Sequence, residues 1–270
     1  MHGSAECAIP GWWDRFFVLE QSYSSTSLSI SLRKAGLSNA DLSSLTVALR
    51  SFIYRTVDPK LPLHVEIDAS ENNLKDLPMG LMLQEFLQNP GPTYLRSVKL
   101  YKNQVSDLTC AVLAKILWHQ AEACEEIHLS HNEISHRGVA TLLAALAMHP
   151  KDVYPRSVEH LDEAIPCWLR LEHNQATSIE HVLAALQKDP VRLRSCSAPR
   201  GDGASCSAFR CTMATAGKEE TPHVHLYCIN KQKAMKDHLE EQSQVESETI
   251  ESMVLTVADA VVAGEFNLES

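Results

Sequence analysis

Motifs of nucleotide binding and of common catalytic sites are missing from this sequence. It contains no G-x-x-x-x-G-K-[ST] loop, no H-E-x-x-H helix and no G-x-S-x-G nucleophile turn. The one glycine pair that suggests a phosphate loop, Gly201 and Gly203, is not followed by a helical pattern. These absences predict a protein without catalytic activity and without a bound cofactor.

The sequence also lacks long apolar runs and concentrated positive charge. No segment approaches the stretch of about 18 apolar residues that spans a bilayer, and no basic segment followed by an apolar run lies near Met1. A net charge of -10 argues against binding to nucleic acid, which requires a basic surface. We therefore expect a cytosolic or nuclear protein that binds neither membranes nor nucleic acid.

Short strings of alternating apolar residues followed by asparagine recur along the chain. The string from Leu95 to Val105 matches L-x-x-L-x-L-x-x-N-x-L if Val is accepted for Leu, and a second copy runs from Cys124 to Ile134. Weaker copies are Leu169–Asn174, Ile67–Leu74 and Ile30–Leu37, where Ala35 replaces the asparagine. Alternate residues of a strand point to one side, and an asparagine amide can satisfy backbone groups at the following bend. The strings predict neighbouring parallel strands with a structural asparagine ladder of Asn72, Asn103, Asn132 and Asn174.

Helical patterns follow the strand strings. Apolar residues recur at helical spacing at Leu108, Ala111, Val112, Ile116 and Leu117, and again at Val139, Leu142, Leu143 and Leu146. Residues 40–53 and 178–187 repeat this pattern, and Asp107, Ser135 and Ser178 are expected to cap the helix starts. Each unit is therefore predicted to consist of a strand and a helix.

These strings resemble the leucine-rich repeat, and a step of 29 residues from Leu100 to Leu129, with room for a full helix, resembles its ribonuclease-inhibitor-like class. The resemblance covers roughly residues 27–188. It implies an α/β solenoid: a short right-handed βα arc with a parallel inner sheet and outer helices. The spacing between equivalent strand positions is irregular: it is 37 residues before the central repeats and 42 residues after them. This irregular spacing predicts an uneven arc.

Members of this class, including ribonuclease inhibitor and the Ran GTPase-activating protein, present a curved surface to a protein partner. The resemblance therefore implies a protein-binding scaffold whose partner the sequence does not identify. Two alternatives remain open: a GTPase-activating regulator of the Ran-activator type, and the recognition arm of a longer multidomain protein.

The composition divides the chain into four parts. Residues 1–26 are expected to form an N-terminal aromatic cap that contains Trp12, Trp13, Phe16 and Phe17, and residues 27–189 hold about five βα units, interrupted by an insertion at 148–165. Residues 190–222 are predicted to be a flexible insertion rich in Cys, Ser and Gly. Residues 223–270 are expected to hold a last strand and an acidic helix, for which capping of the repeats is favoured over docking of a partner.

The residues between the inward apolar positions of the strands are predicted to form the binding face. Equivalent positions on neighbouring strands lie about 5 Å apart and therefore form columns. The predicted protein-binding residues are Asp68, Lys99, Tyr101, Glu126, His128, Trp168, Arg170 and Glu172. Tyr101, Trp168 and Arg170 are the strongest candidates because these residue types anchor protein interfaces. The alternative is a solvated sheet face that binds no partner.

Two groups of histidine and cysteine carry atoms that could bind a metal ion. His131 and His173 occupy matching positions beside Glu126 and His128, but a third fixed ligand is not evident, which favours ordinary surface histidines. The second group comprises Cys196, Cys206, Cys211, His223, His225 and Cys228. Its spacing lacks a C-x2-C knuckle, so a flexible insertion with reduced thiols is favoured over a structural zinc site. The sequence thus predicts no metal site.

Overall fold

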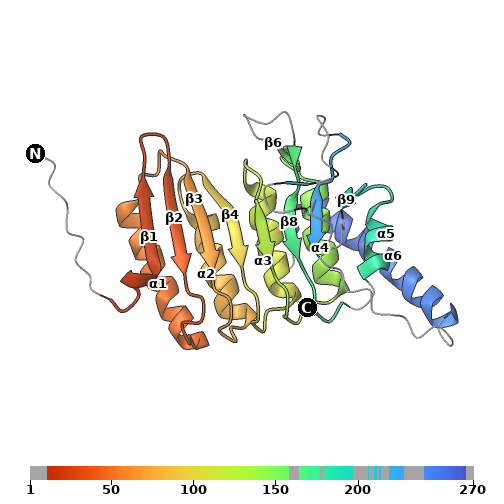
Figure 1. The fold of residues 1–270 in the computed structure, drawn as a ribbon, viewed down its shortest axis with the longest axis horizontal. Helices are drawn as coiled ribbons and strands as arrows, with labels where there is room; N and C mark the ends of the chain where they lie inside the picture. Colours follow the sequence, from red (N-terminus) through yellow and green to blue (C-terminus); the bar gives the residue numbers. More distant parts are fainter. Residues whose placement is uncertain are drawn as a thin grey trace, which may run out of the picture.

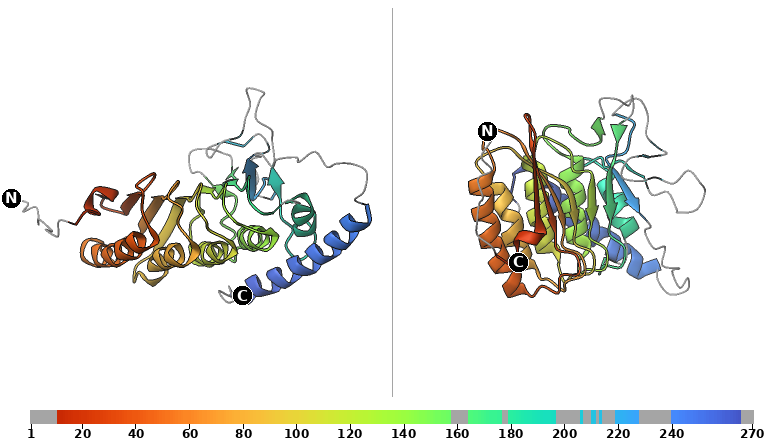
Figure 2. Two further views of the ribbon diagram at one scale, coloured as in Figure 1. Left: turned by 90° about the horizontal axis from the view of Figure 1, so that it is seen from below. Right: turned by 60° about the vertical axis from the view of Figure 1, so that its left-hand side comes forward.

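The computed structural model describes residues 11–157, 164–176, 179–196, 206, 210, 211, 213, 219–227 and 240–265. These residues form a mixed α/β structure in which helices line one face of an eight-stranded sheet (Figures 1 and 2). The strand order is β1-β2-β3-β4-β5-β8-β10-β9, and every neighbouring pair is parallel except β1 and β2. The prediction of a mainly parallel sheet with helices is confirmed.

The central strands follow one another in chain order. Their bounds are β2 Thr26–Ser31, β3 Leu63–Asp68, β4 Thr93–Lys99, β5 Glu126–His128 and β8 Cys167–Arg170, followed by β10 Val224–Tyr227 and the edge strand β9 Ser195–Cys196. The register pairs the apolar position of each string with its counterpart on the next strand: Ile30, Ile67, Val98, Ile127, Leu169 and Leu226. All six side chains are buried. The alternation in the sequence therefore identifies the face that packs against the helices.

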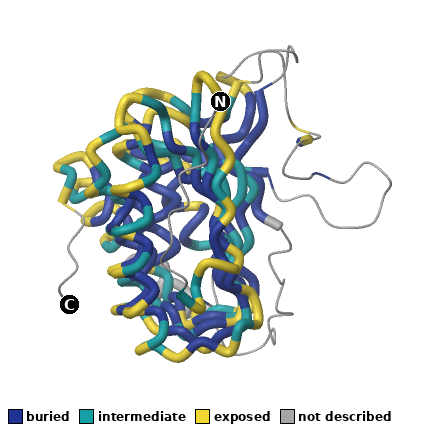
Figure 3. The backbone as a smooth tube through the Cα atoms, turned by 90° about the vertical axis from the view of Figure 1, so that its left-hand side faces the viewer, coloured by how far each residue is buried: buried dark blue, intermediate teal, exposed yellow. Residues whose placement is uncertain are grey.

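Five helices cover that face: α1 Asn39–Thr56, α2 Asp76–Gln88, α3 Asp107–His119, α4 His136–Ala147 and α5 Ile179–Leu186. The start of α1 is fixed by a capping box between Ser38 and Asp41. Helix α2 carries Pro78 in its first turn, where proline costs little because those N–H groups have no partner within the helix. Apolar side chains from the helices and the sheet fill the space between the two layers. In Figure 3 the buried residues, in dark blue, lie on the sides of the two layers that face each other.

The expectation that Asp107 caps a helix is corrected by the structure. The N-cap of α3 is Ser106, and Asp107 is the first helical residue. The Asp107 carboxylate instead accepts hydrogen bonds from the backbone N–H of Ser135, at 2.8 Å, and from its hydroxyl, at 2.5 Å. Ser135 does cap α4, as expected, by accepting a hydrogen bond from the Arg137 N–H. Asp107 thus fixes the start of the next helix, and Ser178 lies outside the described residues.

Each of the four asparagines predicted to form a ladder bonds to its own turn and to the preceding one. The Asn132 side-chain carbonyl accepts from the N–H groups of Asn103 and Val105, at 3.1 and 3.3 Å. Its amide nitrogen donates to the carbonyls of Leu100 and Leu129, both at 2.9 Å. Equivalent bonds are made by Asn72, Asn103 and Asn174. The asparagines therefore hold neighbouring turns in register.

Segments before and after the predicted repeats pack against them. Strand β1 (Phe17–Gln21) pairs antiparallel with β2, and Phe16 and Phe17 are buried while Trp12 is exposed. At the other end, α6 (Glu240–Val262) packs across α4 and α5 through a stripe that includes Val254, Val257, Ala258 and Val261 (Figure 2). The apolar stripe of this helix thus contacts its own chain. None of the helices in the described part is both long and apolar enough to span a membrane.

The insertion at 148–165 contains ordered structure. Its short strands β6 (Arg156–Ser157) and β7 (Ala164–Ile165) pair antiparallel. The buried Tyr154 hydroxyl accepts a hydrogen bond from the Cys124 N–H at 3.0 Å. This bond links the insertion to the residues just before β5. Much of the predicted 190–222 insertion, including Gly201 and Gly203, lies outside the described residues.

Candidate functional site

The face of the sheet opposite helices α1 to α5, which we call the open face, carries the residues predicted to bind a partner. The strand register places Asp68, Lys99, His128 and Arg170 opposite one another in one row. A second row runs through Glu66, Ser97, Glu126, Trp168 and His225. Tyr101 and Glu172 follow two residues after Lys99 and Arg170, respectively. Residues from five separate strands and their adjoining turns therefore meet on one surface.

An aromatic group lies at the carboxyl ends of β4 and β5 on the open face. The rings of Tyr101 and His128 stack with centroids 5.1 Å apart and an angle of 24° between their planes. His131 meets the same tyrosine edge-on, also at 5.1 Å, and the Lys102 Nζ lies 5.7 Å from its ring centroid. The His128 Nε2 is 2.7 Å from the Ser130 hydroxyl. These contacts fix the orientation of Tyr101 while leaving part of it accessible.

Charged residues around this group are paired with one another. Lys99 Nζ lies 2.8 Å from a Glu126 carboxylate oxygen, and the Arg170 Nε donates to Glu172 Oε1 at 2.9 Å. Glu172 is buried, and its Oε2 has no hydrogen-bond partner among the described residues. Both signs of charge are therefore present on the open face, which carries hydrogen-bond donors as well as acceptors.

The environment of His128 keeps its imidazole neutral near pH 7. Partial burial, followed by the charges of Arg170 and Lys99, lowers the pKa of His128 to about 4, against a smaller opposing effect of Asp68. Neutral His128 can accept a hydrogen bond and can stack with Tyr101 without bringing a third positive charge between Lys99 and Arg170.

We predict that His128 makes stability depend on pH. Its pKa is lower in the folded state than the value of about 6.5 expected in the unfolded state, so the unfolded chain binds more protons between these two values. Its stabilising contribution is complete above about pH 6.5 and is lost as the pH falls towards 4. In His128→Gln, the loss of unfolding free energy between pH 7 and pH 4.5, measured by urea titration, should be smaller by about 1–2 kcal/mol after discounting for solvent screening. Equal pH dependence in both proteins would contradict this assignment.

The neighbouring histidines His131 and His173 lie together, with ring centroids 4.2 Å apart. Burial and the charge of His173 lower the pKa of His131. Within the described ranges, the one group of three or more possible metal ligands lies elsewhere, so this pair is not part of a metal-binding cluster there. The pair adds a second aromatic contact beside Tyr101.

The cysteines from the predicted insertion form a separate group at the edge of the open face. Cys196, Cys206 and Cys211 are buried together with His225, and Trp168 packs against them. His223 is not part of the group. Its Nδ1 accepts a hydrogen bond from the Arg194 backbone N–H at 3.1 Å. Burial, followed by the positive charge of Arg194, lowers the pKa of His223 to about 4. Cys228 lies outside the described residues. Three cysteines that are scattered in sequence are therefore neighbours in the fold.

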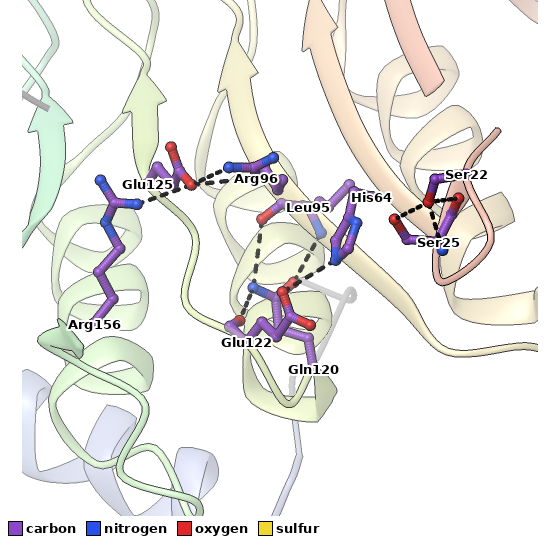
Figure 4. A network of polar contacts seen from close by, with 9 residues as sticks. All are labelled: Ser22, Ser25, His64, Leu95, Arg96, Gln120, Glu122, Glu125 and Arg156. Atoms are coloured by element: carbon purple, nitrogen blue, oxygen red, sulfur yellow. Dashed lines mark hydrogen bonds and ion pairs between the residues drawn. The ribbon is translucent and has the colours of Figure 1, made fainter. Parts of the chain in front are cut away.

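A polar network near the starts of the strands was not predicted from the sequence (Figure 4). Glu125 Oε1 accepts from Arg96 on β4, at 2.7 Å, and lies 2.9 Å from Arg156 Nη1 on β6. Nearby, His64 Nε2 lies 3.1 Å from a Glu122 oxygen. Arg156 is distant in sequence and outside any repeat string, so no local pattern points to this contact, which anchors the 148–165 insertion to the sheet.

Comparisons with known proteins do not supply a function. No family model, curated protein or solved structure matches this chain. The open face and the cysteine group are therefore the features from which function has to be inferred.

Proposed function

We propose that this chain is a leucine-rich-repeat solenoid of the ribonuclease-inhibitor-like class and that its open face binds a protein partner without catalysing a reaction. The repeat assignment is supported by the parallel strands in chain order, the helices on one side and the asparagines that bond consecutive turns. A repeat sheet of this type presents neighbouring strands as one continuous binding surface.

One observation carries the binding proposal: the stacked pair of Tyr101 and His128 sits among the paired charges of Lys99, Arg170 and Glu172 on a face that none of the described helices covers. Tyrosine and arginine are, with tryptophan, the residue types most enriched among the residues that dominate binding at protein interfaces. Because their neighbours already hold them in place, little side-chain entropy is lost on binding.

Affinity capture from cell extract with open-face variants tests this proposal. We expect the triple variant Lys99→Ala, Tyr101→Ala, Arg170→Ala to recover the partner at least about tenfold less than the wild type, since loss of one interface anchor can cost about 2 kcal/mol. Trp168 is left unchanged because it also packs against the cysteine group. Recovery is quantified by mass spectrometry against an untagged control.

The matched control changes exposed side chains on the helical side. Val47 and Tyr54 on α1 and Leu77 on α2 are 65%, 84% and 68% exposed. A Val47→Ala, Tyr54→Ala, Leu77→Ala variant should recover the same proteins as the wild type. If the control variant loses the captured proteins and the open-face variant keeps them, the binding surface lies on the helices and the proposal is wrong.

A further inference from the structure

The cysteine group has the geometry of a closed metal site. Cys196 ends β9, His225 lies on the adjacent β10, and Cys206 and Cys211 come from the intervening chain. One potential ligand atom from each of the four residues lies within 4.8 Å of all the others, and all four side chains are buried. The sulfur of Cys206 is 3.9 Å from those of both Cys196 and Cys211.

These separations match sulfur atoms that share one ion. A tetrahedral zinc ion with Zn–S bonds of about 2.3 Å places its sulfur ligands about 3.8 Å apart. A disulfide would bring two sulfur atoms to about 2 Å instead. Three thiolates and one imidazole form one of the common structural zinc sets, and with four protein ligands no position is left for a substrate.

The surroundings of the four residues also favour a bound ion. Nδ1 of His225, a residue only 1% exposed, has no hydrogen-bond partner among the described residues. Its ring is stacked on Trp168, with centroids 4.6 Å apart and planes 10° apart, which fixes the orientation of the imidazole. Among the described residues, the three cysteines form a buried cluster separate from the main core, with the partly buried Trp168 as its one further apolar contact. Such a small cluster provides little hydrophobic stabilisation, so a metal ion would supply much of the free energy that orders it.

We propose that Cys196, Cys206, Cys211 and His225 bind one structural Zn²⁺ ion, which ties the chain around Cys206 and Cys211 to strands β9 and β10. The spacing Cys-x9-Cys-x4-Cys-x13-His differs from that of a knuckle because the ligands come from separate strands and from the chain between them. On binding, Zn²⁺ displaces the thiol protons to solvent, and no oxidant or reductant is required. The site is independent of the proposed protein binding, although Trp168 contacts both regions.

Metal analysis of the full chain, purified under reducing conditions without a metal-affinity tag, tests this site. We expect about one zinc ion per wild-type chain and at most about 0.2 in Cys206→Ser or Cys211→Ser. Cys110→Ala is the matched control, because this buried cysteine of α3 lies outside the cluster, and it should keep about one zinc ion. Full zinc content in both serine variants would overturn the assignment.

A cobalt titration of the wild type keeps the test valid if the variants fail to fold. After removal of bound metal, Co²⁺ should produce the intense visible bands of tetrahedral thiolate coordination, and one equivalent of Zn²⁺ should abolish them. Absence of zinc in the purified protein together with absence of these bands would overturn the proposal. A disulfide between Cys196 and Cys206 would also overturn the proposal if it formed under native conditions in metal-free protein and persisted when zinc was added. Such a bond would assign the cluster to redox chemistry.

Discussion

Replacing Asn132 with alanine should destabilise the protein by about 4 kcal/mol, because it removes the partners of several buried backbone groups at once. The N–H groups of Asn103 and Val105 lose their acceptor, while the carbonyls of Leu100 and Leu129 each lose one of two side-chain donors and keep those of Asn103 and Asn174. Each unsatisfied buried group costs about 1–3 kcal/mol, less where water enters the space that the side chain leaves. Urea unfolding followed by circular dichroism measures the change in free energy.

The neighbouring Glu133→Ala variant is the control for this measurement. Glu133 is exposed and only its backbone N–H takes part in the turn, where it donates to the Val105 carbonyl. Its replacement should change stability by no more than about 0.5 kcal/mol. If Asn132→Ala cost as little as Glu133→Ala, the asparagines would not hold the turns together as described.

Gly138→Ala should destabilise the protein by about 2–3 kcal/mol, although alanine is normally the better helix former. A Cβ atom at position 138, in the first turn of α4, would lie 2.3 Å from Asp107 Oδ1 and 2.8 Å from the Ile134 Cγ2. Asp107 cannot move away without losing its hydrogen bonds to Ser135. The substitution therefore breaks the contact that links the starts of α3 and α4, and thermal and urea unfolding should both report the loss.

The opposite sign is expected for Gly80→Ala in α2. A Cβ atom there would meet the Val112 Cγ2 at 3.6 Å, an ordinary van der Waals contact. Alanine should therefore stabilise this helix by about 0.5–1 kcal/mol. The two glycines form a matched pair, and a gain in stability at both positions would show that Asp107 is free to move.

The sheet can be predicted from the sequence because the residues that specify each strand lie close together in the chain. The alternating apolar residues around Val98 and Ile127 fix which side of each strand is buried, and equal positions in each string give the register that aligns Lys99 with His128. The positions on the open face follow from the same periodicity. The contacts between those side chains do not, because the stacking of Tyr101 on His128 depends on rotamers that no periodicity specifies.

The remaining features depend on contacts between residues far apart in the chain. A helix is expected in each unit, but the residues of α2 do not show a clear helical pattern because Pro78 and Gly80 interrupt its start, while Met79, Met82 and Phe86 complete the buried face. Arg156 meets Glu125 only because the insertion folds back onto the sheet. The cysteines and histidines of the 190–228 region are recognisable in the sequence as possible zinc ligands, but their spacing does not show that they meet: Cys206 and Cys211 are not tightly spaced, and His225 joins them from a separate strand.

Site-specific photo-crosslinking tests the binding role of the open face most directly. Tyr101 and Tyr54 are each replaced by p-benzoylphenylalanine in cells; the first lies on the open face and the second is an exposed residue of α1 on the helical side. Irradiation should give a covalent adduct with the partner from position 101 and none from position 54. Adducts from position 54 alone, or the same result at both positions, would contradict the proposal that the open face is where this protein binds its partner.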